Sequence, residues 1–143
     1  MEYLTKDWRN SKDIGLLILR VVFGIVLIYG HGFGKVANIF SGEEIQFMDP
    51  IGIGANLSFY LAAFAEFICS LFLIVGLFSR IATLILVINF FVIFIFHAFI
   101  VGDDFSILEM RYLYLFTFIA LFFTGPGKFS LDNSLLRPKG EVG

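Results

Sequence analysis

The sequence alternates between long apolar stretches and short polar segments, and the apolar stretches lack a polar face. A helix on the surface of a soluble domain keeps a polar stripe along its length. A helix needs about 20 mostly apolar residues to cross a bilayer, and four stretches come close to that length. The pattern therefore predicts an all-α membrane protein, a four-transmembrane-helix antiparallel bundle with spans at 14–34, 57–78, 81–101 and 107–124.

The segments between the predicted spans differ in length. Residues 79–80 and 102–106 leave room only for a turn between antiparallel neighbours, whereas residues 35–56 form a longer outer loop. Within that loop, Ser41 and Glu44 have the spacing of a capping box, which favours a short amphipathic lid helix on the outer surface. An ordinary loop is the alternative.

Charge is distributed unevenly between the two sides of the predicted bundle. Apart from Arg20, which lies inside the first span, the outer side holds the basic residues Lys35 and Arg111, and the other side holds seven, which are Lys6, Arg9, Lys12, Arg80, Lys128, Arg137 and Lys139. Because basic residues concentrate on the cytoplasmic side, both termini are predicted to be cytoplasmic. The chain, 1–143, is then a single membrane domain with an interfacial C-terminal tail, 125–143, pinned by Lys128 and Phe129.

Composition supports a lipid environment and excludes several classes of protein. Hydrophobic residues make up 59% of the 143 residues and charged residues only 15%, whereas soluble domains are about a quarter charged. The net charge of −2 provides no field for nucleic acid. The single cysteine excludes a disulfide framework and a cysteine-clustered metal site, so we expect no metal centre.

Ionisable side chains inside a membrane span are costly, and they need a partner or a function. Arg20 and Glu66 are the most deeply placed of these in the predicted spans. Their heights, taken from the rise of about 1.5 Å per residue, lie within reach of an arginine side chain. We therefore expect a structural ion pair between them, with Glu66 alternatively the inner end of a proton path or ligand pocket.

The remaining polar residues of the spans gather near the outer leaflet. His31 and Lys35 share a face of the first span, His97 ends the third, and Glu109 and Arg111 begin the fourth. This concentration predicts a site in which Glu66 and Glu109 are catalytic and His31, His97, Lys35 and Arg111 bind the ligand. The alternative is structural, with the histidines as interfacial hydrogen bonders and the two cations as snorkelling anchors.

Several segments together resemble the DoxX family of small four-helix membrane proteins over about residues 14–133. These are the runs Gly30-His31-Gly32-Phe33-Gly34-Lys35, Asp49-Pro50-Ile51-Gly52, Phe64-Ala65-Glu66-Phe67, Gly76-Leu77-Phe78-Ser79-Arg80, the residue His97 and the closing Gly125-Pro126-Gly127-Lys128-Phe129-Ser130-Leu131-Asp132. The resemblance implies a multi-pass protein of the bacterial inner membrane. It also implies a relationship to the small subunit of thiosulfate:quinone oxidoreductase, or to membrane complexes that handle sulfur or oxidative stress.

These observations lead to a principal hypothesis and an alternative from another class. The first is a subunit of a quinone-dependent oxidoreductase, with no intrinsic cofactor, a quinone as substrate, and a membrane or periplasmic partner that carries the electrons. The alternative is a non-catalytic anchor that stabilises a larger membrane complex. A b-haem held by His31 and His97 is less favoured, because Lys35 and the outer acids crowd the same place. A small-solute carrier is a further alternative.

Overall fold

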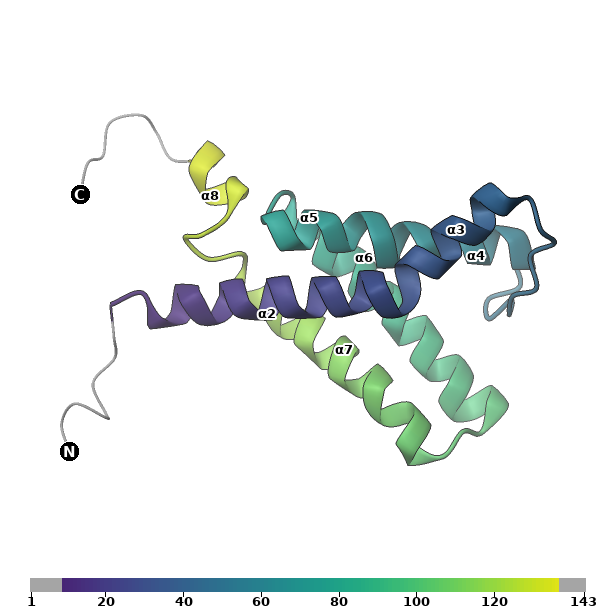
Figure 1. Ribbon diagram of the computed structural model, residues 1–143. Helices are drawn as coiled ribbons and strands as arrows, with labels where there is room; N and C mark the ends of the chain where they lie inside the picture. The colour runs from purple at the N-terminus through teal and green to yellow at the C-terminus, as the bar shows by residue number, and fades with distance from the viewer. Residues whose placement is uncertain (1–8, 137–143) are drawn as a thin grey trace.

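The computed structural model describes residues 9–136, which form helices joined by turns and loops (Figure 1). Four of these helices are long and apolar enough to cross a membrane, namely Ser11–Ser41, Ala55–Val75, Ser79–Val101 and Phe105–Thr124. The prediction of four helices long and apolar enough to cross a membrane is therefore confirmed. Successive spans are antiparallel, so the two ends of the described chain lie at the same end of the bundle.

Three of the four long helices contain a π-helical turn. The first comprises α2 (Ser11–Leu27), η1 (Ile28–Gly32) and α3 (Phe33–Ser41). The second comprises α4 (Ala55–Ala63), η2 (Phe64–Cys69) and α5 (Ser70–Val75). The third comprises α6 (Ser79–Ile95) and η3 (Phe96–Val101), and it is followed by α7 (Phe105–Thr124) and the short α8 (Leu131–Leu136).

The core lies where these helices face one another. The helix α6 packs against α7, α2 packs against α5, and the π turns η1 and η2 meet. The rings of Phe90 and Tyr114 stack at 4.8 Å, and Phe118 continues the aromatic column. Tyr114, in the middle of α7, is buried in this core. The core thus joins all four long helices at the level of η1 and η2.

The first helix is longer than predicted, and the outer loop is correspondingly shorter. It continues through Ser41 and ends where Gly42 adopts the left-handed conformation, with φ 73°. Ser41 therefore ends a helix rather than starting one, and its hydroxyl accepts a hydrogen bond from the backbone N–H of Glu43. The predicted lid helix is wrong, since residues 43–54 contain no regular helix.

The loop is held instead by Asp49. Its carboxylate accepts hydrogen bonds from the backbone N–H groups of Ile53 at 2.9 Å and Gly54 at 2.8 Å, and from the Ser58 hydroxyl at 3.0 Å. These contacts fasten the loop to the start of α4. Phe47, nearer the middle of the loop, packs edge-on against Phe59 at 5.2 Å.

The tail after α7 folds back onto the bundle up to residue 136. The carboxylate of Asp132 accepts hydrogen bonds from the backbone N–H groups of Phe78 at 2.7 Å and Ser79 at 2.8 Å, where α6 begins. The backbone N–H of Lys128 donates to Asp13 at 2.8 Å. The predicted tail is therefore docked on protein over this part, and residues 137–143 lie outside the described residues.

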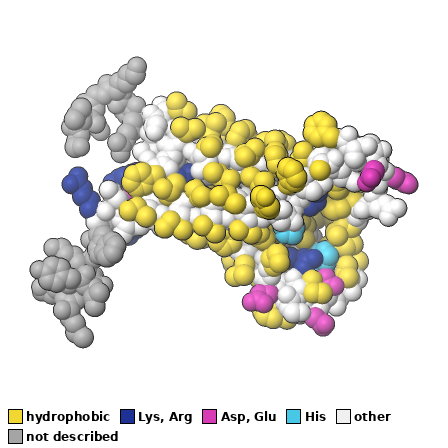
Figure 2. All heavy atoms as spheres, in the orientation of Figure 1, with side chains coloured by type: hydrophobic (Ala, Val, Ile, Leu, Met, Phe, Trp, Pro, Cys, Tyr) yellow, Lys and Arg dark blue, Asp and Glu magenta, His cyan; other side chains and the backbone are white. Residues whose placement is uncertain are grey.

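The face of the bundle shown in Figure 2 is largely apolar along the helices. Tyr29, Phe40 and Phe123 are 88%, 84% and 74% exposed, and many aliphatic residues are exposed beside them. A soluble monomer rarely exposes contiguous apolar surface on this scale. The surface is that of a protein in contact with the lipid bilayer.

Candidate functional site

Each of the three helices with a π turn places one of the predicted site residues in that turn. His31 lies in η1, Glu66 in η2 and His97 in η3. A π turn inserts an extra residue into the helical repeat, which rotates the following side chains, and such turns occur frequently at functional sites. The irregular backbone therefore coincides with the titratable residues on three separate helices.

These residues line a cavity of about 450 Å³ between the α3–α4 end and the α6–α7 end of the bundle. Figure 2 shows histidine and basic side chains in the recess between these two parts of the molecule. Its lining includes all the residues predicted for the outer site except Glu109, namely His31, Lys35, Glu66, His97 and Arg111. Apolar side chains complete the wall, among them Phe47, Met48, Phe90 and Ile93.

Glu66 is the most buried charge in the cavity, with 3% of its side chain exposed. Its carboxylate forms an ion pair with Lys35 through one oxygen and accepts a hydrogen bond from Asn89 Nδ2 at 3.3 Å through the other. The Lys35 ammonium also lies 5.9 Å from the centre of the Phe47 ring. Lys35 from the first helix and Asn89 from the third thus hold the Glu66 carboxylate inside the bundle.

The predicted ion pair between Arg20 and Glu66 is therefore replaced by another arrangement. Arg20 is fully buried and donates hydrogen bonds to the carbonyl oxygens of Leu73 and Phe129. The antiparallel register explains the difference, because Gly32 faces Glu66 and Gly24 faces Ser70. Arg20 is accordingly level with the end of α5, where the last carbonyl groups of a helix need donors.

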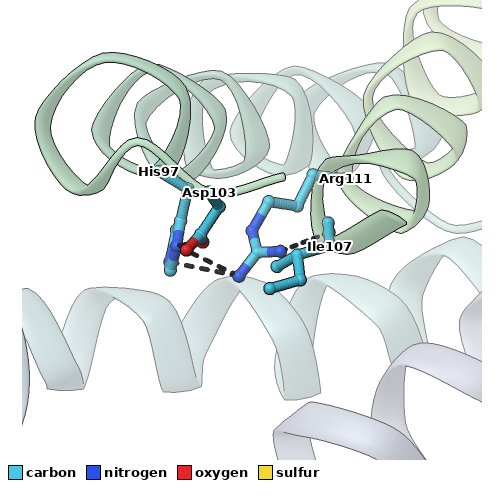
Figure 3. A network of polar contacts seen from close by, with 4 residues as sticks. All are labelled: His97, Asp103, Ile107 and Arg111. Carbon is cyan, nitrogen blue, oxygen red and sulfur yellow. Dashed lines mark hydrogen bonds and ion pairs between the residues drawn. The ribbon is translucent and has the colours of Figure 1, made fainter. Parts of the chain in front are cut away.

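His97 forms a second polar cluster with Asp103, from the turn before α7, and Arg111, from α7 itself (Figure 3). Its Nδ1 lies 2.6 Å from the carboxylate of Asp103, and Arg111 Nη2 lies 3.2 Å from both ring nitrogens. Equal distances place the guanidinium over the ring, out of line with either lone pair. The other terminal nitrogen of the guanidinium, Nη1, donates a hydrogen bond to the carbonyl oxygen of Ile107. The carboxylate makes Nδ1 the donor of neutral His97, which leaves Nε2 as an acceptor.

The turn after η3 makes this contact possible. Gly102 takes the left-handed conformation, with φ 76°, and the backbone N–H of Asp103 then donates to the His97 carbonyl oxygen at 3.0 Å. This turn brings a residue six positions along the chain back to the imidazole. The role of Asp103 was not predicted from the sequence. A histidine in the last turns of a helix that ends at Gly102-Asp103 is the pattern that could have indicated it.

His31 approaches the cavity from the first helix. Its ring lies edge-on to Tyr114, with the centroids 6.0 Å apart. Among residues 9–136, the His31 ring has no hydrogen-bond partner. The imidazole is half-buried and faces the cavity with its nitrogens available to a ligand.

The prediction for Glu109 is wrong as regards its position. Its side chain is exposed on α7 and does not line the cavity, since Arg111 and Tyr114 occupy the face of that helix turned towards the bundle. Asn89 on α6 bonds another helix through Glu66. Cys69 is fully packed in the core, as expected for a structural residue. Among residues 9–136, no cluster of three or more His, Cys, Asp or Glu side chains is arranged to hold a metal ion.

The structure defines an integral membrane protein of four antiparallel helices with a polar cavity at one end. The family model described as DoxX matches residues 15–98, which is more than half of the chain and includes His31, Glu66 and His97. The chain belongs to the DoxX family. Comparisons with curated proteins and with solved structures give no match.

Proposed function

We propose that this protein is a membrane subunit of a quinone-linked redox complex, and that its cavity binds the quinone headgroup. The observation that supports this most strongly is the meeting of His31, Glu66 and His97, each from a π turn, in one cavity. A quinone site needs apolar walls around a flat ring, hydrogen-bonding groups for the two carbonyl oxygens, and a proton carrier. The lining residues supply all three.

The charges of the lining favour a headgroup that gains negative charge. Lys35 and Arg111 are cationic, and among the lining side chains only Glu66 opposes them. A fixed positive surplus in a site of low dielectric stabilises charge that develops on the ligand during reduction. The same surplus would lower the proton affinity of a bound quinol and so assist its oxidation.

The two histidines provide separate routes for the two protons of a quinol. Nε2 is the acceptor of neutral His97, because Nδ1 is bonded to Asp103, and Arg111 Nη2 lies 3.2 Å from this Nε2. His31 also lines the cavity and has no hydrogen-bond partner among the described residues. Oxidation of a quinol releases two protons to such groups and two electrons to a partner subunit, and reduction of a quinone runs in reverse.

The setting follows from the sequence and the family. The bias of Lys and Arg towards one side supports a setting in which both termini are in the cytoplasm of a bacterial cell and the cavity is in the outer leaflet of the inner membrane. The electron-carrying partner then approaches from within the membrane or from the periplasm.

The test is quinone retention by protein purified with its native partners. His31→Ala and His97→Ala each remove one hydrogen-bonding group, and we expect retention to fall about twofold to tenfold. Glu66→Gln should slow turnover. Glu109→Gln is the matched control, because its side chain is charged and close in sequence but lies outside the cavity. Wild-type retention and turnover in both histidine variants would refute the proposal.

A specific observation favours the second candidate, a non-catalytic anchor. Lys35 forms an ion pair with Glu66, and His97 contacts the carboxylate of Asp103, so these four side chains have protein partners without a ligand. In that case the polar residues would fix the helix packing. The histidine variants would then lower the yield of the assembled complex while leaving its quinone-dependent rate per complex unchanged.

A further inference from the structure

A second, apolar cavity of about 310 Å³ lies beside the polar one. It is a groove between the second helix and α6, and the loop segment from Phe47 to Ile53 covers one end of it. Ala62 and Ala65 form its floor, and their small side chains leave the space open. Its rim consists of exposed residues such as Leu61, which is 51% exposed, and Ile88, which is 56% exposed, so the groove opens towards lipid.

The groove and the polar cavity lie next to each other and share part of their walls. Phe47, Met48 and Ile93 line both of them and form the partition. Asn89 is the main polar residue inside the groove, and its Nδ2 donates to Glu66, which lines the polar cavity. A ligand that filled both spaces would therefore have a polar end near Glu66 and an apolar end facing the lipid.

We propose that the groove binds the isoprenoid side chain of a lipid-soluble quinone whose headgroup lies in the polar cavity. This rests on the proposed function, because it names the part of the ligand that the headgroup site does not hold. The groove walls are almost wholly apolar, which suits a hydrocarbon chain and does not suit a free polar solute. Passage between the two spaces requires Phe47 and Met48 to move, and both belong to the loop that Asp49 fastens to α4.

Bulky substitutions at the rim can close the groove without disturbing the core. Ile88→Trp fills it from α6, and Leu84→Trp is the control, since Leu84 lies four residues earlier, is 44% exposed and does not line the groove. Leu61→Trp fills it from α4, and Leu57→Trp, at a site 50% exposed, is the corresponding control. All four sites face lipid, so each variant should fold.

The assay compares two probes, a benzoquinone without a side chain and the same benzoquinone with a decyl chain, by their dissociation constants from purified protein in one detergent. For each probe, the dissociation constant of the variant is divided by that of the wild type, which removes the contribution of partition of the probe into micelles. We expect Ile88→Trp and Leu61→Trp to weaken binding of the decyl probe about tenfold, which corresponds to about 1.4 kcal/mol, and to leave binding of the headgroup probe unchanged. The control variants should bind both probes as the wild type does. The naphthoquinone counterparts are run alongside, and the same pattern with them supports the proposal equally.

The outcomes separate this proposal from the proposed function. If the headgroup probe binds and the decyl probe is unaffected by the rim variants, the groove proposal is overturned and the headgroup site stands. If neither headgroup binds the wild-type protein, both are overturned. Mass spectrometry of the purified protein adds a further result against the proposal, namely a phospholipid retained by the wild type and lost in Ile88→Trp while quinone binding is unchanged.

Discussion

Gly32 faces the backbone of Glu66 so closely that a Cβ atom at Gly32 would lie 2.6 Å from the Glu66 carbonyl oxygen. This contact joins η1 to η2, and it sets the register that brings Lys35 to the Glu66 carboxylate. Small residues permit such close packing of membrane helices, where apolar side chains alone provide little driving force. The polar cavity therefore depends on a glycine that itself takes no part in the chemistry.

Gly32→Ala should lower the stability of the bundle, because the obstructing atoms belong to a backbone and have little freedom to move. Overpacking of this kind costs about 1–3 kcal/mol. Gly30→Ala and Gly34→Ala are matched controls, since an added Cβ there meets no atom within 4 Å. Thermal unfolding in detergent, followed by circular dichroism, should show a lower midpoint for Gly32→Ala than for either control. Equal midpoints for all three would show that the helices are farther apart.

The Lys35–Glu66 ion pair should be visible in a double-mutant cycle. Breaking a buried pair by removing one partner costs about 3–5 kcal/mol, and the 16% exposure of the Lys35 side chain places the loss towards the lower end. The double change Lys35→Met with Glu66→Leu should therefore be less harmful than Lys35→Met alone, as measured by unfolding midpoint and accumulation in the membrane.

A second cycle with Arg20→Met and Glu66→Leu serves as the control. These two residues bind different partners, so their effects should add to within about 0.5 kcal/mol. Strong coupling in this cycle and none in the Lys35 cycle would restore the pair predicted from the sequence.

Asp132 should contribute to stability as a cap supplied from a distant part of the chain. Its carboxylate accepts from the N–H groups of Phe78 and Ser79 at the start of α6, and loss of a helix cap costs about 0.5–2 kcal/mol. Asp132→Ala should lower the unfolding midpoint and expose the tail to limited proteolysis. Asp104→Ala is the control, because Asp104 precedes α7 without making a side-chain capping bond. An equal effect of the two changes would contradict the assigned role.

The outer loop should loosen in acid through Asp49. Hydrogen bonds from the Gly54 backbone, followed by those from Ser58 and Ile53, hold the pKa of this carboxyl below its ordinary value. A carboxyl with a lowered pKa contributes stability above its unfolded value, about 3.9, and that contribution is lost as the pH falls through the lower folded value. Hydrogen exchange of residues 49–58 should therefore increase at low pH in the wild type. Asp49→Asn should abolish this pH dependence, whereas Asp104→Asn should preserve it.

Much of the architecture could be predicted without coordinates. Spans of about 20 apolar residues follow from the thickness of the bilayer, and short turns such as 102–106 require antiparallel neighbours. The meeting of His31, Lys35, His97 and Arg111 near one end also followed, because residues at equal depth on neighbouring helices lie close together. These inferences need only helix geometry and the position of each residue along its span.

The tertiary structure decided which charged residues pair and which face the cavity. Depth along a helix does not specify rotation about its axis or register against a neighbour, and both were set here by Gly32 against Glu66 and by the π turns. For this reason Glu66 binds Lys35 and not Arg20, Glu109 faces outwards, and Asp103 reaches His97 through the turn at Gly102. Sequence by itself determined the number of spans and the depth of the polar residues, whereas side-chain partners depended on backbone contacts between helices that local sequence does not encode.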